Sequence, residues 1–425
     1  MLLFLLVIAV VLALLGVVHW YVWRRLVRDV TRPGSLARRA GTVAAVVLPL
    51  LSLGALTAGR AGAPFWLQQT LAWPGHLWLA LLLYLVLALA LGEAIRPLLL
   101  RWPLRRAVPT SAVPLWAGVP QGGTGGHNGT AGCVVQDPPR AEAPAEPQPP
   151  GMPRRLFVSR IVAGTAAAAA TATVGYGTYG VLRGPSVKRV TVPLAKLPRA
   201  AHGLRIAVVS DIHIGPILGR AHTQRIVDTI NRTQPDLIAV VGDLVDGSVE
   251  NLGHAAEPLA QLTAPHGSFF VTGNHEYFSG AEEWVDEVRE LGLRPLRNER
   301  VELAGFDLAG VNDVAGANYG DGPDFARALG DRDRARASVL LAHQPVLIHD
   351  AVRHGVDLQL SGHTHGGQMW PGQLLAGLAN PTLAGLEQYG DTQLYVSRGA
   401  GAWGPPVRVG APSDITIVEL AARDS

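Results

Sequence analysis

Cysteine is almost absent from this 425-residue sequence: Cys133 is the only one, and it lies in a segment rich in glycine and proline. A single cysteine excludes an intramolecular disulfide and a thiolate metal cluster, so any bound metal must use His, Asp, Glu or Asn. Net charge is also small, at +3, and the arginines gather beside apolar runs. This distribution is typical of membrane topology, so we expect a lipid bilayer as partner and no nucleic acid.

The first hundred residues contain long uncharged runs, and the mean hydropathy of the whole chain is +0.22. We predict three membrane-spanning helices there, at Leu2 to Trp23, Gly41 to Gly59 and His76 to Gly92. A cleavable signal peptide is the alternative for the first run, but the run is too long and two further spans follow it. A fourth run, Ile161 to Leu182, is rich in Ala, Thr and Gly, which makes its membrane insertion marginal.

These runs divide the chain into four expected parts. Residues 1–106 are predicted to hold the three transmembrane helices, 107–155 a disordered Gly/Pro-rich linker, 156–185 the fourth transmembrane helix, and 186–425 a folded domain. A phosphate-binding loop is the alternative for the glycine-rich linker, but its glycines are not followed by the required lysine.

Arginines in the loops predict an orientation in the membrane. Six crowd the first loop between residues 24 and 39, Arg60 stands alone in the second, and four open the third between residues 96 and 106. Loops one and three are therefore expected in the cytoplasm. If the fourth run spans, the folded domain lies outside the cytoplasm. The pair Arg154-Arg155 also resembles a twin-arginine export signal, although such pairs are common by chance.

From Lys188 onward, short apolar runs alternate with helical segments. Helices are expected at Arg220 to Arg232 and Ala281 to Leu291. Seven runs have strand length, and their β-branched content favours strands buried on both faces: Leu204 to Ser210, Leu237 to Val241, Phe269 to Val271, Val339 to Ala342, Leu358 to Leu360, Leu394 to Val396 and Ile415 to Leu420. We therefore predict an α/β domain with a sheet core.

Polar side chains of one chemical kind follow these strands, and sites in open α/β sheets form at the carboxyl ends of strands. Asp211 and His213 are two residues apart, so they can face the same side and share a cation. Asp243 follows the second strand after Gly242, which allows a sharp turn, and its two oxygens could bridge two cations. We interpret Asp246 as a residue that orients a ligand by a hydrogen bond, with a helix cap as the alternative.

Three further motifs follow later strands. Asn274 offers a neutral carbonyl oxygen, which suits a site where negative charge is already supplied, and it leaves His275 free for the substrate. His343 closes one strand, where a lone histidine would more often be a core residue. His363 and His365 lie between glycines that let a ligand approach the backbone closely. Because five such motifs each follow a predicted strand, we assign them to one metal site rather than to chance.

Together the motifs resemble the calcineurin-like metallophosphoesterase superfamily, whose pattern D-x-H, G-D-x-x-D, G-N-H-[D/E], H and G-H-x-H is filled without a gap. The ending G-H-T-H-G-G-Q, Gly362 to Gln368, is similar to that of a membrane-anchored bacterial branch. The resemblance covers about Lys188 to Leu420. It implies a four-layer α/β/β/α sandwich, here preceded by an all-α transmembrane region.

The resemblance also implies a centre for two divalent ions. The first ion is expected on Asp211, His213, Asp243 and His365, and the second on Asp243, Asn274, His343 and His363, with Asp243 as the bridge. Oxygen and nitrogen ligands without sulfur suit Mn, Fe, Zn, Co or Ni. His275 is implied as the catalytic group that stabilises the transition state or protonates the leaving oxygen.

We therefore expect a hydrolase that uses metal-activated water to cleave a phosphodiester or pyrophosphate bond, on a phosphate-ester substrate that is lipid-linked or belongs to the cell envelope. The alternatives are a phosphomonoesterase or protein phosphatase of the same superfamily, and a transporter or sensor with an attached phosphoesterase. A non-catalytic scaffold disagrees with the intact ligand positions. Two pairs of residues are weaker candidates. Asn312 and Asp313 could approach the site, but a turn explains them equally well. Arg398 and Arg408 could bind phosphate, but an exposed surface arginine is the commoner case.

Overall fold

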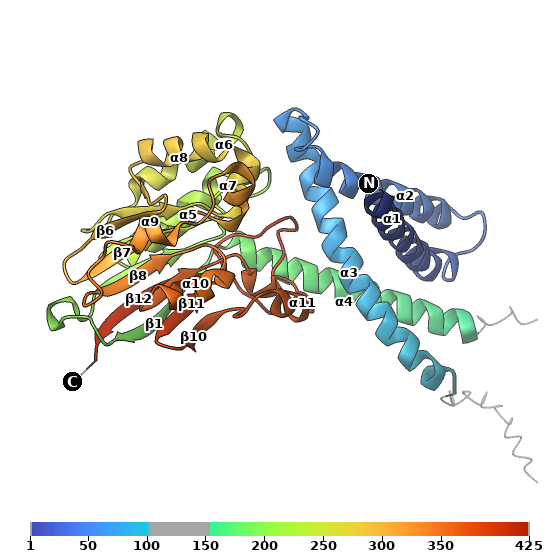
Figure 1. The fold of residues 1–425 in the computed structure, drawn as a ribbon. Coiled ribbons are helices and arrows are strands. Elements are labelled where there is room, and N and C mark those ends of the chain that lie inside the picture. Colours follow the sequence, from blue (N-terminus) through green and yellow to red (C-terminus); the bar gives the residue numbers. More distant parts are fainter. Residues whose placement is uncertain (1, 102–153, 424–425) are drawn as a thin grey trace, which may run out of the picture.

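The computed structural model describes residues 2–101 and 154–423 (Figure 1). The predicted linker, residues 107–155, lies outside the described residues except for its last two positions. These residues comprise an N-terminal group of helices and the predicted folded domain up to residue 423.

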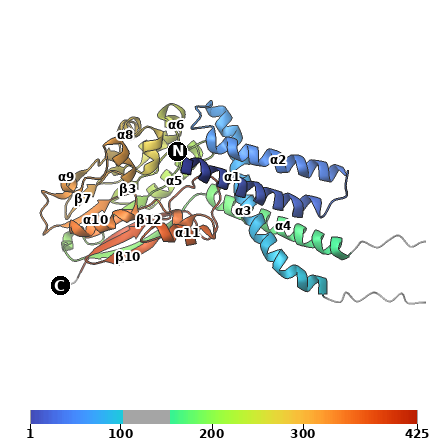
Figure 2. The same cartoon turned by 45° about the vertical axis from the view of Figure 1, so that its right-hand side comes forward.

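Four long helices are apolar and long enough to cross a membrane, by length and composition. They are α1 (Leu2–Trp23), which continues into a short π-helical turn (Arg24–Arg28), α2 (Leu36–Thr57), α3 (Phe65–Arg101) and α4 (Arg154–Leu182). They project from one end of the C-terminal domain (Figures 1 and 2). Helix α3 is longer than the span predicted from its apolar run, because a change in hydropathy alone does not end a helix.

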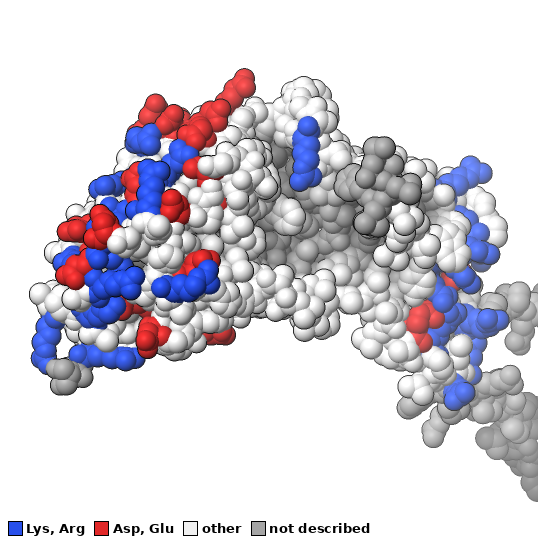
Figure 3. All heavy atoms as spheres, in the orientation of Figure 1, with Lys and Arg blue, Asp and Glu red and all other residues white. Residues whose placement is uncertain are grey.

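The arginine-rich ends of these helices lie together. Nη2 of Arg25, after α1, is 3.0 Å from Oε2 of Glu93 on α3, and Nη2 of Arg96 donates to Oγ of Ser159 on α4 at 3.3 Å. In Figure 3 this basic end is separated from the charged surface of the C-terminal domain by a band almost free of Lys, Arg, Asp and Glu. The predicted first loop therefore lies on the same side of the helix group as the described ends of α3 and α4.

Two six-stranded sheets form the centre of the C-terminal domain. The first has the order β1 (Ser186–Leu194), β12 (Asp414–Ala422), β2 (Arg205–Val209), β3 (Leu237–Val241), β4 (Ser268–Val271) and β5 (Arg294–Pro295). The second has the order β10 (Gly385–Tyr389), β11 (Thr392–Val396), β9 (Leu358–Ser361), β8 (Ala337–Leu341), β7 (Phe306–Gly310) and β6 (Glu299–Glu302). Strands β2, β3 and β4 run parallel, as do β7, β8, β9 and β11.

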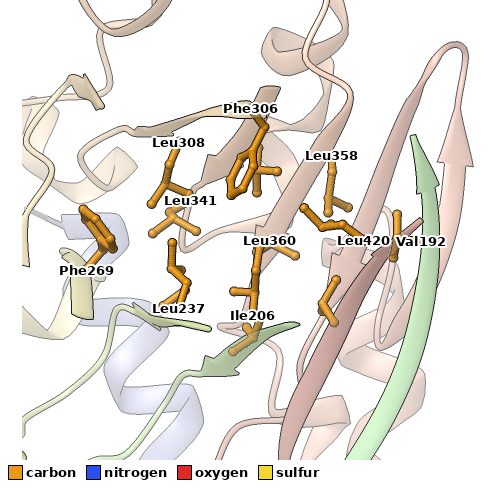
Figure 4. Close-up of a cluster of buried hydrophobic side chains, with 14 of the residues drawn as sticks. Val192, Ile206, Leu237, Phe269, Phe306, Leu308, Leu341, Leu358, Leu360 and Leu420 are labelled. Carbon is orange, nitrogen blue, oxygen red and sulfur yellow. The ribbon is translucent and has the colours of Figure 1, made fainter. Parts of the chain in front are cut away.

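Helices cover the outer face of each sheet. The first sheet carries α5 (Arg220–Arg232), α6 (Val249–Ala256), α7 (Asn274–Ser279) and α8 (Ala281–Glu290), and the second carries α9 (Phe325–Leu329), α10 (Ile348–Arg353) and α11 (Gly372–Ala379) at its end. Buried residues between the sheets, such as Leu237, Phe306 and Leu360, form the central core (Figure 4). A second core lies between the first sheet and its helices, and a third lies between the second sheet and its helices. The predicted α/β/β/α sandwich after an all-α region is therefore confirmed.

Candidate metal centre

The predicted site residues meet at the carboxyl ends of parallel strands from both sheets. Register aligns these ends, because Val209 of β2 pairs with Val240 of β3, and Val241 of β3 pairs with Val271 of β4. In the facing sheet, Leu341 of β8 pairs with Leu360 of β9. The loops that follow these strands therefore emerge at one level, where side chains from both sheets can converge.

The backbone at this level is strained in a consistent way. Five of the seven predicted ligands have positive φ between 51° and 71° although they are not glycine: Asp211, His213, Asp243, His363 and His365. Such conformations cost on the order of 1 kcal/mol or more each and persist only where the surroundings enforce them, typically at functional sites. Gly362 makes the convergence possible, since a Cβ there would lie 1.7 Å from Oγ of Ser210.

One cluster contains Asp211, His213 and His365, whose donor atoms lie within 4.8 Å of one another. Nε2 of His365 is 3.2 Å from Oδ1 of Asp211 and 3.0 Å from Nε2 of His213. The carboxylate of Asp211 also accepts hydrogen bonds from the backbone N–H of His363 and from the Ser210 hydroxyl. All three donors are buried, so this cluster could hold a cation away from bulk water.

A second cluster contains Asp243, His343 and His363. Nε2 of His343 lies 3.1 Å from Oδ2 of Asp243, while Nδ1 donates to the carbonyl of Val241 at 2.9 Å. That hydrogen bond leaves the lone pair of Nε2 directed at the site, as second-sphere contacts do for histidine ligands. The donor set therefore fits a divalent cation.

Asn274 supplies an independent test of that fit. Its Oδ1 atom is buried and has no hydrogen-bond partner among the described residues. A buried amide oxygen without a partner is costly, so its presence calls for a ligand. A cation held with Asp243 and His343 would satisfy it, in the role the sequence predicts.

Asp243 belongs to the second cluster and also approaches the first. Its Oδ2 atom is 3.1 Å from Nε2 of His343 in one cluster and 3.9 Å from Nε2 of His213 in the other. Its Oδ1 accepts the backbone N–H of His275 at 2.9 Å. The carboxylate of Asp243 is therefore within reach of the histidines of both clusters, and its role as a bridge stays a prediction.

Asp246 contacts two histidines rather than a helix end. Its Oδ1 lies 3.0 Å from Nδ1 of His213 and 2.7 Å from Nδ1 of His275. The N-cap of the next helix, α6, is Ser248, so Asp246 does not cap it. Its contacts are those of a residue that orients the ring of a ligand.

His275 stands at the opening of the site. Its Nε2 is 4.0 Å from Oδ2 of Asp243, and its side chain keeps some exposure to solvent. The exposed rings of Trp403 and Phe278 flank it, with centroids 5.7 and 5.8 Å away. A substrate that approached the two clusters would pass this imidazole.

Charge within the site sets the protonation of its histidines. Burial lowers the pKa of His213, but Asp246 and two further carboxylates outweigh burial and raise it to about 9. Burial, followed by the charge of His343, lowers the pKa of His363 to about 4. A cation would therefore displace a proton from His213, whereas His363 is neutral and ready to bind near pH 7.

Two buried residues near the ligands were not assigned to the site from the sequence. Glu276 accepts the backbone N–H groups of Gly273, Asp243 and Leu244 at 2.6 to 3.0 Å, and burial together with Asp243 raises its pKa to about 7. The sequence offered one signal for this residue, because Glu276 occupies the last position of the G-N-H-[D/E] pattern. It fixes the loops that carry Asn274 and Asp243.

Arg408 is the second of these residues. Its Nη2 is 3.0 Å from Nδ1 of His365, and its other nitrogens donate to the carbonyls of His365, Ala411 and Gly401. It is buried and bound to the protein, which corrects both the phosphate and the surface interpretations. An arginine far along the chain from its partner carries no sequence sign of such a contact.

The pair Asn312 and Asp313 follows β7 and forms a turn, and the charge of Asp313 also acts on the predicted ligand His343, whose pKa it helps to raise. Asp313 caps a 3-10 helix by accepting the N–H of Ala315, and Asn312 donates to Asp321. Arg398 lies near Asp414, with 3.8 Å between Nη1 and Oδ2.

Comparison with known proteins identifies the family. Residues 204–367 match the calcineurin-like phosphoesterases. A metallophosphoesterase of Helicobacter pylori is 40% identical over 259 residues, which are 60% of this chain and 69% of that protein. A Danio rerio protein named as a transmembrane protein with a metallophosphoesterase domain is 38% identical, over 58% of this chain and 59% of its own length.

A dimetal phosphatase of Danio rerio has 12% identity and a TM-score of 0.35, over 50% of this chain and 91% of its own, a likeness too distant to bear on the site. The identity to the Helicobacter pylori protein extends over more than two thirds of that protein. The chain therefore belongs to the calcineurin-like metallophosphoesterase family.

Proposed function

We propose that this chain is a membrane-anchored phosphohydrolase that requires two divalent ions and cleaves a phosphodiester or pyrophosphate bond. The observation that carries the proposal is the pair of donor clusters that meet at Asp243, with Nε2 of His275 4.0 Å from that carboxylate and outside the predicted ligand set. When bound, the two ions supply a water of lowered pKa and neutralise charge on the phosphoryl oxygens. The donor set, free of sulfur, suits Mn, Fe, Zn, Co or Ni.

The protein's own groups bind and orient the reactants. The first ion is assigned to Asp211, His213, Asp243 and His365, and the second to Asp243, Asn274, His343 and His363. A protonated His275 donates from Nε2 to the leaving oxygen, while Asp246 accepts from Nδ1 and offsets the positive charge of the ring. General acid catalysis of this kind contributes roughly 10²- to 10⁴-fold.

The rim of the site supports a substrate with an apolar group beside the phosphate. Trp403 and Phe278 are exposed, and their ring centroids lie 5.7 and 5.8 Å from that of His275. Apolar rings at the entrance favour a bulky ester or lipid group over a small free phosphate. This is why a diester or pyrophosphate is proposed rather than a monoester.

The helix group supports anchoring and an orientation. The arginine-rich ends of α1, α3 and α4 lie together, away from the domain (Figure 1), and the positive-inside rule assigns that side to the cytoplasm. The catalytic domain would then be extracytoplasmic. The ending Gly362 to Gln368 supports a place in the membrane-anchored bacterial branch.

The test uses the full chain purified in detergent. Bis-p-nitrophenyl phosphate, p-nitrophenyl phosphate and a dinucleoside pyrophosphate are offered after EDTA treatment, with and without Mn²⁺ or Zn²⁺. We expect no turnover in EDTA, recovery with metal, and faster turnover of the diester or pyrophosphate than of the monoester. An Asp243→Asn variant serves as the inactive control. A preference for the monoester would overturn the bond assignment, and absence of metal-dependent turnover on all three would overturn the proposal.

A further inference from the structure

Helix α11 presents an apolar face that the protein leaves uncovered. Leu374, Leu375 and Leu378 are 70%, 73% and 86% exposed, and Trp370, just before the helix, is 54% exposed. The sequence has no charged residue from Trp370 to Asn380. Single exposed leucines are ordinary, but a contiguous apolar cluster of this kind indicates an interaction surface.

The segments beside α11, at Met369 and Val409, pack with residues of the membrane-spanning helix α4. Met369 and Val409 pack in the cluster that contains Ala170 and Val174 of α4. The backbone N–H of Trp370 donates to the carbonyl of Val409 at 2.9 Å. The uncovered leucines therefore begin within a few residues of a direct contact with α4, at the edge of the domain that faces the helices (Figure 1).

The contact also fixes a depth. The backbone N–H of Arg408 donates to the carbonyl of Gly177 at 3.3 Å, and a Cβ at Gly177 would lie 2.7 Å from Val407. Gly177 lies about a turn and a half before α4 ends at Leu182. In a bilayer that α4 crosses, a segment in contact with this last part of the helix would lie near the boundary between headgroups and acyl chains, where interfacial helices bind.

A short chain of contacts connects this surface to the catalytic group. Gln368, between the predicted ligand His365 and α11, donates from Nε2 to the carbonyl of Trp403 at 2.9 Å and accepts the N–H of Trp403 at 3.0 Å. The Trp403 ring stands beside His275. The next residue, Gly404, faces His76 of α3, since a Cβ there would lie 3.7 Å from Cδ2 of that ring. The rim of the site is therefore built against two membrane-spanning helices.

We propose that Trp370 and α11 insert into the leaflet nearest the catalytic domain, and that the site takes its substrate from that leaflet. The substrate class is a membrane-embedded amphiphile whose phosphate lies at the headgroup level. The chemistry of this inference rests on the proposed function, whereas the insertion does not. We favour the bilayer over a second copy of the chain as the partner of this apolar face, because the segments beside α11 pack against the spanning helix α4 near its end.

Insertion is tested with the full chain in phosphatidylcholine vesicles. Cys133 is replaced by serine, and an environment-sensitive fluorophore is attached to Leu375→Cys or, as the control, to Asp286→Cys on α8. We expect the Leu375 probe to be quenched by shallow spin-labelled lipids and shielded from aqueous iodide roughly tenfold relative to the control. Iodide access equal to that of the control would overturn the insertion. A disulfide formed between Leu375→Cys chains would overturn it in favour of a second copy.

Substrate access is tested with a triple variant, Leu374→Ser, Leu375→Ser and Leu378→Ser, beside the exposed apolar control Val352→Ser. A phospholipid diester with a fluorescent headgroup, embedded in the vesicles, is compared with soluble bis-p-nitrophenyl phosphate. We expect the triple variant to lose about tenfold on the lipid and to keep its turnover of the soluble diester. Equal turnover of the lipid by both variants would overturn the access role. If neither substrate is hydrolysed by the unmodified chain, the proposed function fails while the insertion measurement still stands.

Discussion

Oδ1 of Asp246 lies 2.7 Å from Nδ1 of His275, the proposed catalytic imidazole. The same oxygen lies 3.0 Å from Nδ1 of the predicted ligand His213, so one carboxylate atom orients a metal ligand and the catalytic group together. Burial opposes ionisation of Asp246, but the two histidines outweigh it and hold its pKa well below the usual range. The carboxylate therefore stays charged wherever the site can work.

Replacement of Asp246 should weaken the metal centre and catalysis at once. An Asp246→Asn variant keeps the shape but loses the negative charge, so its neutral amide oxygen accepts from the two rings more weakly. We expect affinity for the first ion to fall by roughly 10- to 100-fold, as for other residues that orient histidine ligands. Calorimetric titration with Mn²⁺ measures the affinity, with Asp286→Asn on the surface as control. Unchanged affinity and turnover would show that the two contacts have no functional role.

Removal of the His275 ring should separate catalysis from metal binding. The residue is outside both predicted ligand sets, so a His275→Ala variant should keep both ions while its kcat falls by roughly 10²- to 10⁴-fold. Metal content by plasma mass spectrometry and turnover of bis-p-nitrophenyl phosphate are the two measurements. His349→Ala, which removes a histidine remote from the motifs, is the control. A variant with both metals and near-normal kcat would refute the assignment.

The strand ends were predictable because each is marked twice, by an apolar run and by a polar motif that follows it. Strands without such runs were missed. β1 alternates in exposure and carries Lys188 and Arg189, and it is held by its parallel pairing with β12 from the far end of the chain. No local pattern carries that information, because the partner strand supplies the burial.

The site residues that belong to motifs were predictable for the same reason, because each motif follows an apolar run. Arg408 and Glu276 complete it through contacts that depend on the fold. Arg408 reaches His365 from 43 residues away, and Glu276 reaches Asp243 from 33. The contact of Gly177 with Val407 and Arg408 likewise has no sign in the sequence, since a glycine in an Ala-rich helix has no pattern of its own.

Metal binding should release protons at neutral pH. In the metal-free protein the pKa of His213 is raised to about 9, so its ring is protonated at pH 7.5 and must lose a proton to bind a cation. Apparent affinity should rise by about tenfold per pH unit up to about pH 9 for this one proton. Titration of Mn²⁺ in two buffers of different ionisation enthalpy measures the release. An Asp246→Asn variant, which loses the strongest opposing charge, should release less. A release of zero at pH 7.5 would contradict the raised pKa.

Glu276 should make the metal-free protein less stable as the pH rises. Burial, then the charge of Asp243, raises its pKa from 4.5 to about 7, so between these values the folded state binds more protons than the unfolded state. The free energy of unfolding that it contributes is thus fully present below about pH 4.5 and is lost by about pH 7, a change of about 3 kcal/mol. Urea unfolding in EDTA at pH 4.5 and 7 should show this change in the difference between the unmodified chain and Glu276→Gln. A constant difference would contradict the assignment.

Arg408 should matter through its geometry rather than its charge. Its planar guanidinium donates to the carbonyls of His365, Ala411 and Gly401 and to Nδ1 of His365. An Arg408→Lys variant keeps a positive charge, but an ammonium on a flexible stem cannot reach all four acceptors.

Because the acceptors that lose their partner are buried, we expect the free energy of unfolding to fall by about 2–4 kcal/mol. Affinity for the first ion should fall with it, since His365 loses the group that fixes its backbone and ring. The control is Arg398→Lys, which alters a half-exposed arginine with a looser contact to Asp414. If Arg408→Lys kept the stability and the metal affinity of the unmodified chain, the charge of Arg408 alone would account for its role, and the geometric explanation would be wrong. In that case a neutral Arg408→Gln variant should lose more stability and more metal affinity than Arg408→Lys.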